Sequence, residues 1–360
     1  MLKSMKSLLR DSRVAVTGAT GTIGKELVRQ LLQHPVAEIR ALDNNESSLF
    51  FLNEAYREEP RLQVFLSDIR DAAKMRKMFD GIDFVFHTAA FKHVPLCERS
   101  PFDAVQTNII GVQNIIQAAL AQKVKKVLFT SSDKAVNPTN VMGTSKLMGE
   151  RLITAANALK RTDDAPIFTS TRFGNVAGSR GSVVPLFCEQ IAKGGPVTLS
   201  DPGMTRFVMT LKDAVHLVIT SMFLAKGGEV FITKMKVLRI EDLAEVMISL
   251  ISPLYGYKPP KMELRKIGAR PGEKLYEELM NDEETRRAFD TKDFFIVLPA
   301  FRNLYNDIDY TYKNLSMAPV ETTYNSANFT PMTKREIKDF LLLPDVLPTD
   351  IQSALLQKGH

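Results

Sequence analysis

The strongest constraint on the fold is a glycine-rich loop near the start of the chain, Gly18-Ala19-Thr20-Gly21-Thr22-Ile23-Gly24. It follows an apolar run at 13–17 that predicts a buried strand, and it precedes a predicted helix at 23–33. Glycines let a backbone approach a pyrophosphate, and a helix N-terminus offers free N–H groups and a positive dipole end. The loop therefore predicts a dinucleotide site on a strand–turn–helix unit, although glycine turns also serve helix–strand packing.

An acidic residue favours one of the two common nicotinamide dinucleotides. Asp43 ends a second predicted strand at 38–42 and lies about 20 residues past Gly24, the spacing of a ribose-binding acid. Its carboxylate would accept from ribose hydroxyls and repel a 2′-phosphate. Asn44 and Asn45 follow, with no arginine beside them, so we expect NAD rather than NADP. We expect Asp68-Ile69, after the third strand, to contact the adenine. The alternative interpretation of Asp43 is that it is a surface acid that ends a strand.

Predicted strands and helices alternate through the first half of the chain. Further strands are predicted at 62–66, 83–87, 126–130 and 167–172, and further helices at 47–57, 72–79, 101–122 and 142–159. This alternation is typical of right-handed βαβ crossovers in a parallel sheet. We therefore expect an α/β fold with a Rossmann-type, doubly wound parallel sheet.

The regular pattern weakens after Gly174. Proline and glycine cluster there, while helices remain predicted at 184–193 and 240–250. We expect an NAD-binding domain at 1–173 and a smaller, mainly substrate-binding lobe at 174–300, which can share strands with the first domain. Residues 301–360 are polar and aromatic with weak periodicity, and the sequence assigns them no role.

Composition narrows the partners and the compartment. The net charge of +6 is scattered along the 360 residues, which argues against nucleic acid and fits an anionic small substrate. Cys97 and Cys188 form no metal-ligand pattern and no disulfide framework, so we expect no metal site and a reducing compartment. No stretch approaches the ~20 apolar residues of a membrane span, and residues 1–13 are too short and polar for a signal peptide. We expect a cytoplasmic protein.

Several long segments, in one order, resemble a single family over the chain up to about Asp282. These segments are 88–95, 132–146, 172–182, 204–207 and 270–274. The chain resembles the extended short-chain dehydrogenase/reductases, and among them the nucleotide-sugar 4,6-dehydratases of polysaccharide biosynthesis that act on UDP-N-acetylglucosamine. The resemblance implies tightly bound NAD, hydride transfer from sugar C4, loss of water across C5–C6 and hydride return to C6. It also implies a homo-oligomer, a dimer or higher, paired through the helices at 101–122 and 142–159.

Met142 stands where most of this family has a catalytic tyrosine, four residues before Lys146. One branch of the family is similar in carrying methionine, and that branch is associated with retention of configuration at C5. A thioether is only a weak acceptor and cannot take a proton. The resemblance implies that Lys146 holds the nicotinamide ribose.

The resemblance assigns Asp133 as the acid and Lys134 as the base of the elimination, adjacent residues after a predicted strand. A lysine can be a base only where burial or a neighbouring cation lowers its pKa. Ser131 or Ser132 would bond the sugar's 4-hydroxyl, and we prefer Ser132. Our hypothesis is that Asp133 takes the proton of that hydroxyl and later delivers a proton to the C6 oxygen.

The resemblance also suggests contacts away from this segment. It implies cofactor contacts at Ala89 and Ala90, and substrate contacts at Lys92, His93, Asn175, Arg180, Ser182, Arg206, Arg270 and Glu273. Because a planar guanidinium suits phosphate, we expect Arg206 and Arg270 at the diphosphate.

Three alternatives stay open. The substrate could be GDP-linked rather than UDP-linked N-acetylglucosamine. A UDP-hexose 4-epimerase shares the fold but has no proton to remove from C5, so the Asp133–Lys134 pair argues against it. A non-catalytic NAD-binding scaffold would have no need of two amines, Lys134 and Lys146, near an acid.

Overall fold

The chain folds into two compact units, each assembled from segments far apart in the sequence. The structure, a computed structural model, describes residues 8–159, 165–179, 181–269, 272–301, 308–312 and 315–357. The first unit comprises Met1–Phe173, Val215–Lys234 and Met280–Thr323, and the second comprises Gly174–Ala214, Met235–Leu279 and Tyr324–His360. The expected lobe at 174–300 and the expected extension at 301–360 are therefore each divided between the two units.

A ten-stranded sheet forms the centre of the first unit, in the order β16-β14-β15-β10-β6-β5-β4-β1-β2-β3. Its parallel strands are β1 (Arg13–Thr17), β2 (Glu38–Asp43), β3 (Leu62–Leu66), β4 (Phe84–His87), β5 (Lys126–Thr130), β6 (Ile167–Arg172) and β10 (Val230–Thr233). Antiparallel strands β15 (Phe294–Val297), β14 (Ala288–Asp290) and β16 (Ala318–Pro319) extend one edge. The predicted α/β fold with a Rossmann-type parallel sheet is confirmed.

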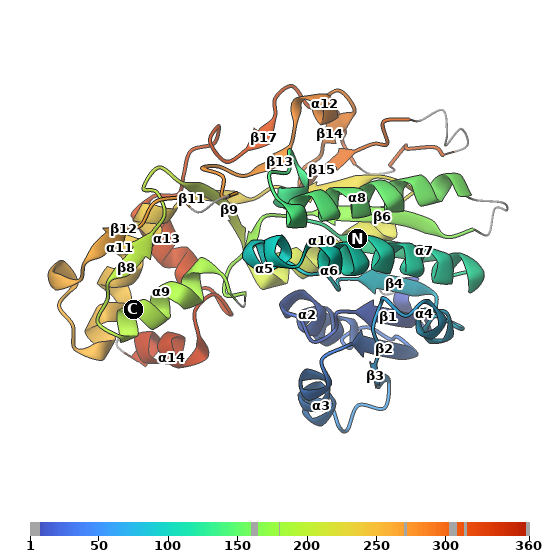
Figure 1. The fold of residues 1–360 in the computed structure, drawn as a ribbon, viewed down its shortest axis with the longest axis horizontal. Coiled ribbons are helices and arrows are strands. Elements are labelled where there is room, and N and C mark those ends of the chain that lie inside the picture. Colours follow the sequence, from blue (N-terminus) through green and yellow to red (C-terminus); the bar gives the residue numbers. More distant parts are fainter. Residues whose placement is uncertain are drawn as a thin grey trace. The chain divides into compact units, whose positions relative to one another are not determined.

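Helices cover both faces of the parallel strands, as their continuous apolar runs require. The first-unit helices are α2 (Thr22–Leu31), α3 (Glu46–Ala55), α4 (Ala72–Met78), α5 (Val94–Arg99), α6 (Pro101–Val105), α7 (Gly111–Ala121), α8 (Val141–Ala156), α10 (Leu211–Leu224, beginning in the second unit) and α12 (Asp282–Thr285). Helices α4, α7 and α8 pack side by side (Figure 1) and share one core with Val85 of β4. The adjacent Phe84 packs edge-on against Phe223 of α10, so α10 covers the opposite face.

The predicted helix at 101–122 is interrupted, which corrects the sequence analysis. A π-helical turn, η1 (Gln106–Ile110), separates α6 from α7. Within this turn the buried Asn108 uses its side chain to bond residues outside the helix. Wider turns of this kind are frequent at functional sites, and apolar periodicity alone does not reveal them.

The second unit is built from small sheets and its own helices. Its three-stranded sheet contains β11 (Lys236–Arg239), β9 (Thr205–Met209) and β7 (Asn175–Val176), and two-stranded pairs join β12 (Leu264–Lys266) to β8 (Val197–Leu199) and β13 (Glu278–Met280) to β17 (Tyr324–Asn325). Its helices are α9 (Val183–Ala192), α11 (Ile240–Ile251), α13 (Lys334–Leu341) and α14 (Thr349–Gln357).

The end of the chain belongs to the core of the second unit. Helix α13 begins with a capping box between Thr333 and Glu336, and its Ile337 and Phe340 are buried. Leu355 of α14 is buried in the same cluster as α9 and α11. These helices have eight and nine residues, and the sequence analysis did not identify them, although the spacing of Thr333 and Glu336 is a capping-box pattern.

Helix α2 starts in very close contact with the loop that precedes it. A Cβ added at Gly24 would lie 2.1 Å from the carbonyl oxygen of Gly18 and 2.7 Å from Cα of Ala19. Both atoms belong to the backbone, so they cannot rotate away. The glycine is therefore required for the strand–turn–helix geometry.

We expect Gly24→Ala to destabilise the first unit. Alanine should gain about 1 kcal/mol of helix propensity, but overpacking against fixed backbone atoms costs about 1–3 kcal/mol or more. Since the contact distances are so short, we expect the clash to prevail and the urea midpoint to fall. Lys25→Ala in the same turn is the control, and a Gly24→Ala midpoint at or above wild type would contradict this account.

Candidate active site

The glycine loop meets the end of β4 where the strand order reverses. Strand β1 lies between β2 and β4, which makes the carboxyl ends of β1 and β4 the topological switch point. Gly18 has a positive φ of 70°, and a Cβ there would lie 2.6 Å from the backbone nitrogen of Ala89. The structure thus brings the loop together with the segment containing Ala89 and Ala90.

The start of α2 is open to an anion. Its N-cap is Gly21, which provides no side-chain hydrogen bond, and its first turn, beginning with Thr22 and Ile23, contains no acidic residue. A Cβ added at Gly21 would meet only the Gly18 oxygen within 4 Å, at 3.2 Å. Free N–H groups beside open space fit the pyrophosphate of a dinucleotide.

Asp43 lies against the same loop. One oxygen of its carboxylate accepts from the Thr20 backbone N–H at 2.9 Å, and the other accepts from the Asn45 N–H at 3.0 Å. Each oxygen keeps a further lone pair with which to accept from a hydroxyl. The backbone therefore orients the carboxylate that the sequence predicts to bind the ribose.

An arginine that the sequence analysis missed pairs with Asp68, the residue predicted to contact the adenine. Arg70 donates to both carboxylate oxygens of Asp68, at 2.6 to 3.0 Å, and Asn44 donates to Asp68 at 3.5 Å. These hydrogen bonds with Arg70 hold the pKa of Asp68 below its ordinary value. Arg70 is distant from Asp43 in the sequence, so the residues adjacent to Asp43 gave no signal of it. The neighbouring Ile69 is buried.

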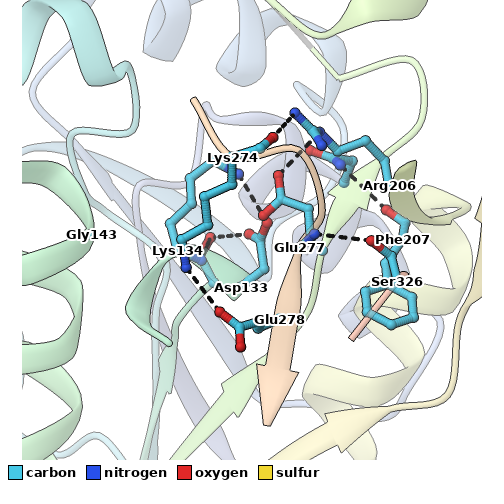
Figure 2. Close-up of polar contacts among 12 residues, drawn as sticks. Asp133, Lys134, Gly143, Arg206, Phe207, Lys274, Glu277, Glu278 and Ser326 are labelled. Carbon is cyan, nitrogen blue, oxygen red and sulfur yellow. Dashed lines mark hydrogen bonds and ion pairs between the residues drawn. The ribbon is translucent and has the colours of Figure 1, made fainter. Parts of the chain in front are cut away.

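The predicted catalytic residues after β5 form a chain of polar contacts (Figure 2). The Ser132 hydroxyl donates to Asp133 Oδ1 at 2.5 Å, and Lys134 Nζ lies 3.0 Å from Asp133 Oδ2. A short 3-10 turn, η2 (Asp133–Ala135), produces this arrangement, and the Ser132 side chain caps it. Asp133 is only 2% exposed, so its contacts are formed in a desolvated environment.

The backbone of this segment is anchored to β6 and the residue that follows it. Ser131 N–H donates to the Thr171 carbonyl at 2.7 Å, and Asp133 N–H donates to the Phe173 carbonyl at 3.2 Å. The hydroxyl of Ser131, the alternative to Ser132, is buried and has no hydrogen-bond partner within the described part of the chain. Of the two serines, Ser132 is therefore the one bonded to Asp133.

Lys146 points from α8 toward the end of β5. Its Nζ donates to the Thr130 carbonyl at 3.0 Å and lies 4.8 Å from the centre of the Phe129 ring. Burial lowers the pKa of this lysine to about 8, against the opposing charge of Glu150. The amine therefore changes charge near pH 8.

Two consecutive residues at the start of α8 fix its distance from the catalytic segment. A Cβ added at Gly143 would lie 2.3 Å from the Lys134 carbonyl oxygen, so only glycine allows this approach. Met142 is 2% exposed and packs with Cys97 and Ala104. The side chain in the tyrosine position fills an apolar cluster.

Asn108 is a further polar residue that the sequence analysis missed. Its side chain accepts from Phe91 N–H at 2.8 Å and donates to the Phe91 carbonyl at 3.0 Å and to Ser145 Oγ at 2.9 Å. It therefore ties the segment after β4 to the residue before Lys146. The available signal was a single polar residue within a predicted apolar helix.

Two predicted substrate residues of the first unit lie at the surface. Lys92 and His93 are exposed, and His93 is the N-cap of α5. Partial burial and the charge of Lys92 lower the pKa of His93. Their roles remain predictions.

The structure describes most, but not all, of the predicted substrate residues in the second unit. Asn175 on β7 donates to the Phe207 carbonyl at 3.4 Å, and Ser182 precedes α9 with a buried hydroxyl that has no partner in the described residues. Glu273 contacts Arg206 at 3.8 Å. Arg180 and Arg270 lie outside the described residues.

Arg206 forms ion pairs and hydrogen bonds with other groups of the protein (Figure 2). Its Nε lies 3.2 Å from the Glu277 carboxylate, and it donates to the carbonyls of Lys274 at 2.9 Å and Leu275 at 3.3 Å. Ser326 accepts from the Glu277 N–H at 2.9 Å. In this structure the guanidinium fixes the segment around 273–277, and direct contact with a diphosphate stays a prediction.

Comparison with known proteins identifies the family. The family model described as polysaccharide biosynthesis protein matches residues 14–299. The chain belongs to this family. An uncharacterised membrane protein of Methanocaldococcus jannaschii is 46% identical over 95% of the chain and 98% of its own length. A UDP-glucose 4-epimerase of Rickettsia massiliae is 35% identical over 96% of the chain and 99% of its own length.

A solved structure extends the similarity to three dimensions. Pen from Bacillus thuringiensis is 42% identical, with a TM-score of 0.86 over 94% of this chain and 99% of its own. Structures that share the fold at lower identity include complexes of a dTDP-glucose 4,6-dehydratase and a UDP-glucose 4-epimerase with NAD. This family member thus has the extended short-chain dehydrogenase/reductase fold of nucleotide-sugar dehydratases and epimerases.

The described residues contain no group of three or more His, Cys, Asp or Glu side chains that could hold a metal ion. No described helix combines the length and the apolar character needed to cross a membrane.

His87 gives this region a pH-dependent stability. It lies at the end of β4, is fully buried, and shares a 2.7 Å hydrogen bond with Thr17 Oγ1. Burial, with a smaller effect of Lys146, lowers the pKa of His87 to about 3. The unfolded chain therefore binds one more proton between about pH 6.5 and pH 3, so stability falls as the pH falls through this range.

We expect His87→Asn, which can keep the bond to Thr17, to flatten this dependence. The slope of the unfolding free energy between pH 6 and pH 4.5 should decrease by up to about 1.4 kcal/mol per pH unit. Urea denaturation at several pH values measures it. Exposed His216 provides the control variant His216→Gln, and equal slopes in wild type and His87→Asn would contradict the buried neutral histidine.

Proposed function

We propose that this family member catalyses the NAD-dependent 4,6-dehydration of UDP-N-acetylglucosamine. The observation that carries the proposal is the contact chain Ser132–Asp133–Lys134 at the end of β5, with the buried Asp133 at its centre. Dehydration requires two proton transfers beyond hydride transfer, and an acid and an amine in contact can supply both. The enzyme class, that of nucleotide-sugar dehydratases and epimerases, follows from the family and the fold.

The cofactor assignment rests on the geometry of the first unit. Bound NAD would accept hydride from sugar C4 and return it to C6. The residues proposed to hold it are the open start of α2 for the pyrophosphate, Asp43 for the adenosine ribose and Lys146 for the nicotinamide ribose. Asp43 supports NAD over NADP, since its carboxylate would repel a 2′-phosphate.

A route for the protons follows from the contacts around Asp133. Ser132 bonds the sugar's 4-hydroxyl, and its own proton points to Asp133 Oδ1 at 2.5 Å. Asp133 receives the hydroxyl proton through this bond and later delivers a proton to the departing C6 oxygen. Lys134 removes the C5 proton. Met142 takes no part in proton transfer, because its thioether is buried in an apolar cluster.

The same arrangement leads us to propose retention at C5. If Lys134 alone removes and returns the C5 proton, both transfers occur on one face of the sugar ring. One residue on one turn, η2, provides the amine. The product would be the 4-keto-6-deoxy sugar with its C5 configuration unchanged.

A 4-epimerase is the second candidate, favoured by the name of the Rickettsia relative. An epimerase needs an acid–base group for the 4-hydroxyl but none for C5. The proposal of dehydration is supported by the amine that accompanies Asp133. A GDP-linked sugar is the other open substrate, because the proposed proton transfers act on the hexose and do not depend on the base.

Pairing of chains also remains a proposal. Phe102 of α6 is 85% exposed and Met148 of α8 is 47% exposed. Exposed apolar side chains on these two helices are consistent with pairing of like chains through them.

Incubation of the purified protein with UDP-N-acetylglucosamine, without added cofactor, tests the reaction. We expect mass spectrometry to detect a product lighter by one water, and in heavy water one deuterium at C5. A parallel incubation with GDP-N-acetylglucosamine tests the nucleotide. An isomer of unchanged mass would instead establish the epimerase.

Two variants test the division of labour. Asp133→Asn should abolish both C4 oxidation and water loss. Lys134→Met should retain C4 oxidation, seen as the near-ultraviolet absorbance of the reduced nicotinamide, but should lose deuterium exchange at C5. Rates should fall by at least ~100-fold for each lost step. Wild-type C4 oxidation by Asp133→Asn would exclude Asp133 as the acceptor of the hydroxyl proton.

A further inference from the structure

A buried arginine holds two carboxylates next to the proposed site. Arg172, the last residue of β6, is 1% exposed. It donates to Glu150 at 2.6 and 3.1 Å and to Glu284 at 2.9 and 3.0 Å. Glu150 and Glu284 are also buried. No role proposed so far uses these three residues, although desolvating three charges is costly unless each is fully paired.

The network adjoins both halves of the site. The residues on either side of Arg172, Thr171 and Phe173, provide the carbonyls that anchor Ser131 and Asp133. Through its side chain, Arg172 holds Glu150, which lies on α8 one turn after Lys146. One residue thus links the end of β6 to the helix that presents the lysine.

The two carboxylates have different cationic neighbours besides Arg172. Arg287 lies 4.0 Å from Glu284, whereas Glu150 lies four residues after Lys146 on one face of α8. Other groups around Lys146 contribute little net charge: His87 of β4 is neutral, Asp133 and Lys134 of η2 are paired, and β5 presents the Phe129 ring and the Thr130 carbonyl. Burial lowers the pKa of Lys146, and Glu150 opposes that effect.

We propose that Glu150 is a positioning residue for Lys146, fixed by Arg172 and Glu284 so that its carboxylate keeps the lysine charged and oriented toward the cofactor. The inference rests on the cofactor site of the proposed function. It does not depend on which reaction follows hydride transfer.

The variants Glu150→Gln and Glu284→Gln separate this role from a merely structural one. Each variant replaces one carboxylate that pairs with Arg172 by a neutral amide. The amide oxygen can still accept a hydrogen bond from the guanidinium. Only Glu150 shares α8 with Lys146. Both variants should lower the melting temperature similarly, whereas only Glu150→Gln should change how cofactor binding depends on pH.

Calorimetric titration with NAD from pH 6 to pH 9, on protein from which the bound cofactor has first been removed, is the measurement. Wild-type affinity should weaken as the pH rises through the pKa of Lys146. Since removal of Glu150 lowers that pKa, the midpoint in Glu150→Gln should shift down by roughly one pH unit. NAD binding by Glu150→Gln should then be about fivefold weaker than wild type at pH 8 and similar at pH 6. Glu284→Gln should keep the wild-type midpoint, and Glu150→Asp should restore it.

An unchanged midpoint in Glu150→Gln, or an equal shift in Glu284→Gln, would overturn the proposal. Should Glu150→Gln not fold, a triple leucine variant of Glu150, Arg172 and Glu284 removes the whole network without leaving an unpaired charge. We expect the same downward shift of the pH midpoint in this variant, and an unchanged midpoint would again overturn the proposal. Because the titration measures cofactor affinity, a protein that binds NAD but dehydrates no sugar contradicts the proposed function and not this inference.

Discussion

Charge burial at the carboxyl end of the parallel sheet governs the arrangement of the first unit. Asp133, Lys146 and Arg172 are each at most 6% exposed, and a buried charge is tolerated only when it is paired and hydrogen-bonded. Asp133 is paired within its own turn, by Ser132 and Lys134, whereas the partners of the other two come from elements distant in sequence: β5 for Lys146, and α8 with α12 for Arg172. Satisfying these charges fixes the mutual position of strand ends and helix starts.

The absence of a phenol changes what this end of the sheet must provide. Met142 occupies an apolar cluster with Cys97 and Ala104, so in the proposed function the proton transfers depend on the segment after β5. Gly143 lets α8 approach the backbone of Lys134. The start of α8 contributes to the site through its close packing on that segment and not through a side chain. A site without tyrosine is therefore chemically complete if Asp133 accepts the proton.

The sequence predicted the parallel strands from β1 to β6 closely, because each contains neighbouring apolar residues and ends at a turn or a polar residue, but it missed the parallel strand β10 (Val230–Thr233). Strands 13–17, 62–66, 126–130 and 167–172 have the predicted bounds. It did not predict the π-helical turn around Asn108, since one extra residue per turn leaves the apolar pattern nearly intact. Nor did it predict that the final helices enter a core, although α13 is amphipathic and begins with the capping-box pattern of Thr333 and Glu336.

The sequence by itself determined the α/β fold, the glycine loop with its acid, and the run from Ser132 to Lys146, since each depends on neighbours in the chain or on a regular period. Only the tertiary structure decided which polar groups meet. It paired Arg206 with Glu277, and Arg172 with Glu150 and Glu284. The physical reason is that ion pairs form between side chains brought together by strand order and helix packing, and a one-dimensional pattern contains neither distance nor burial.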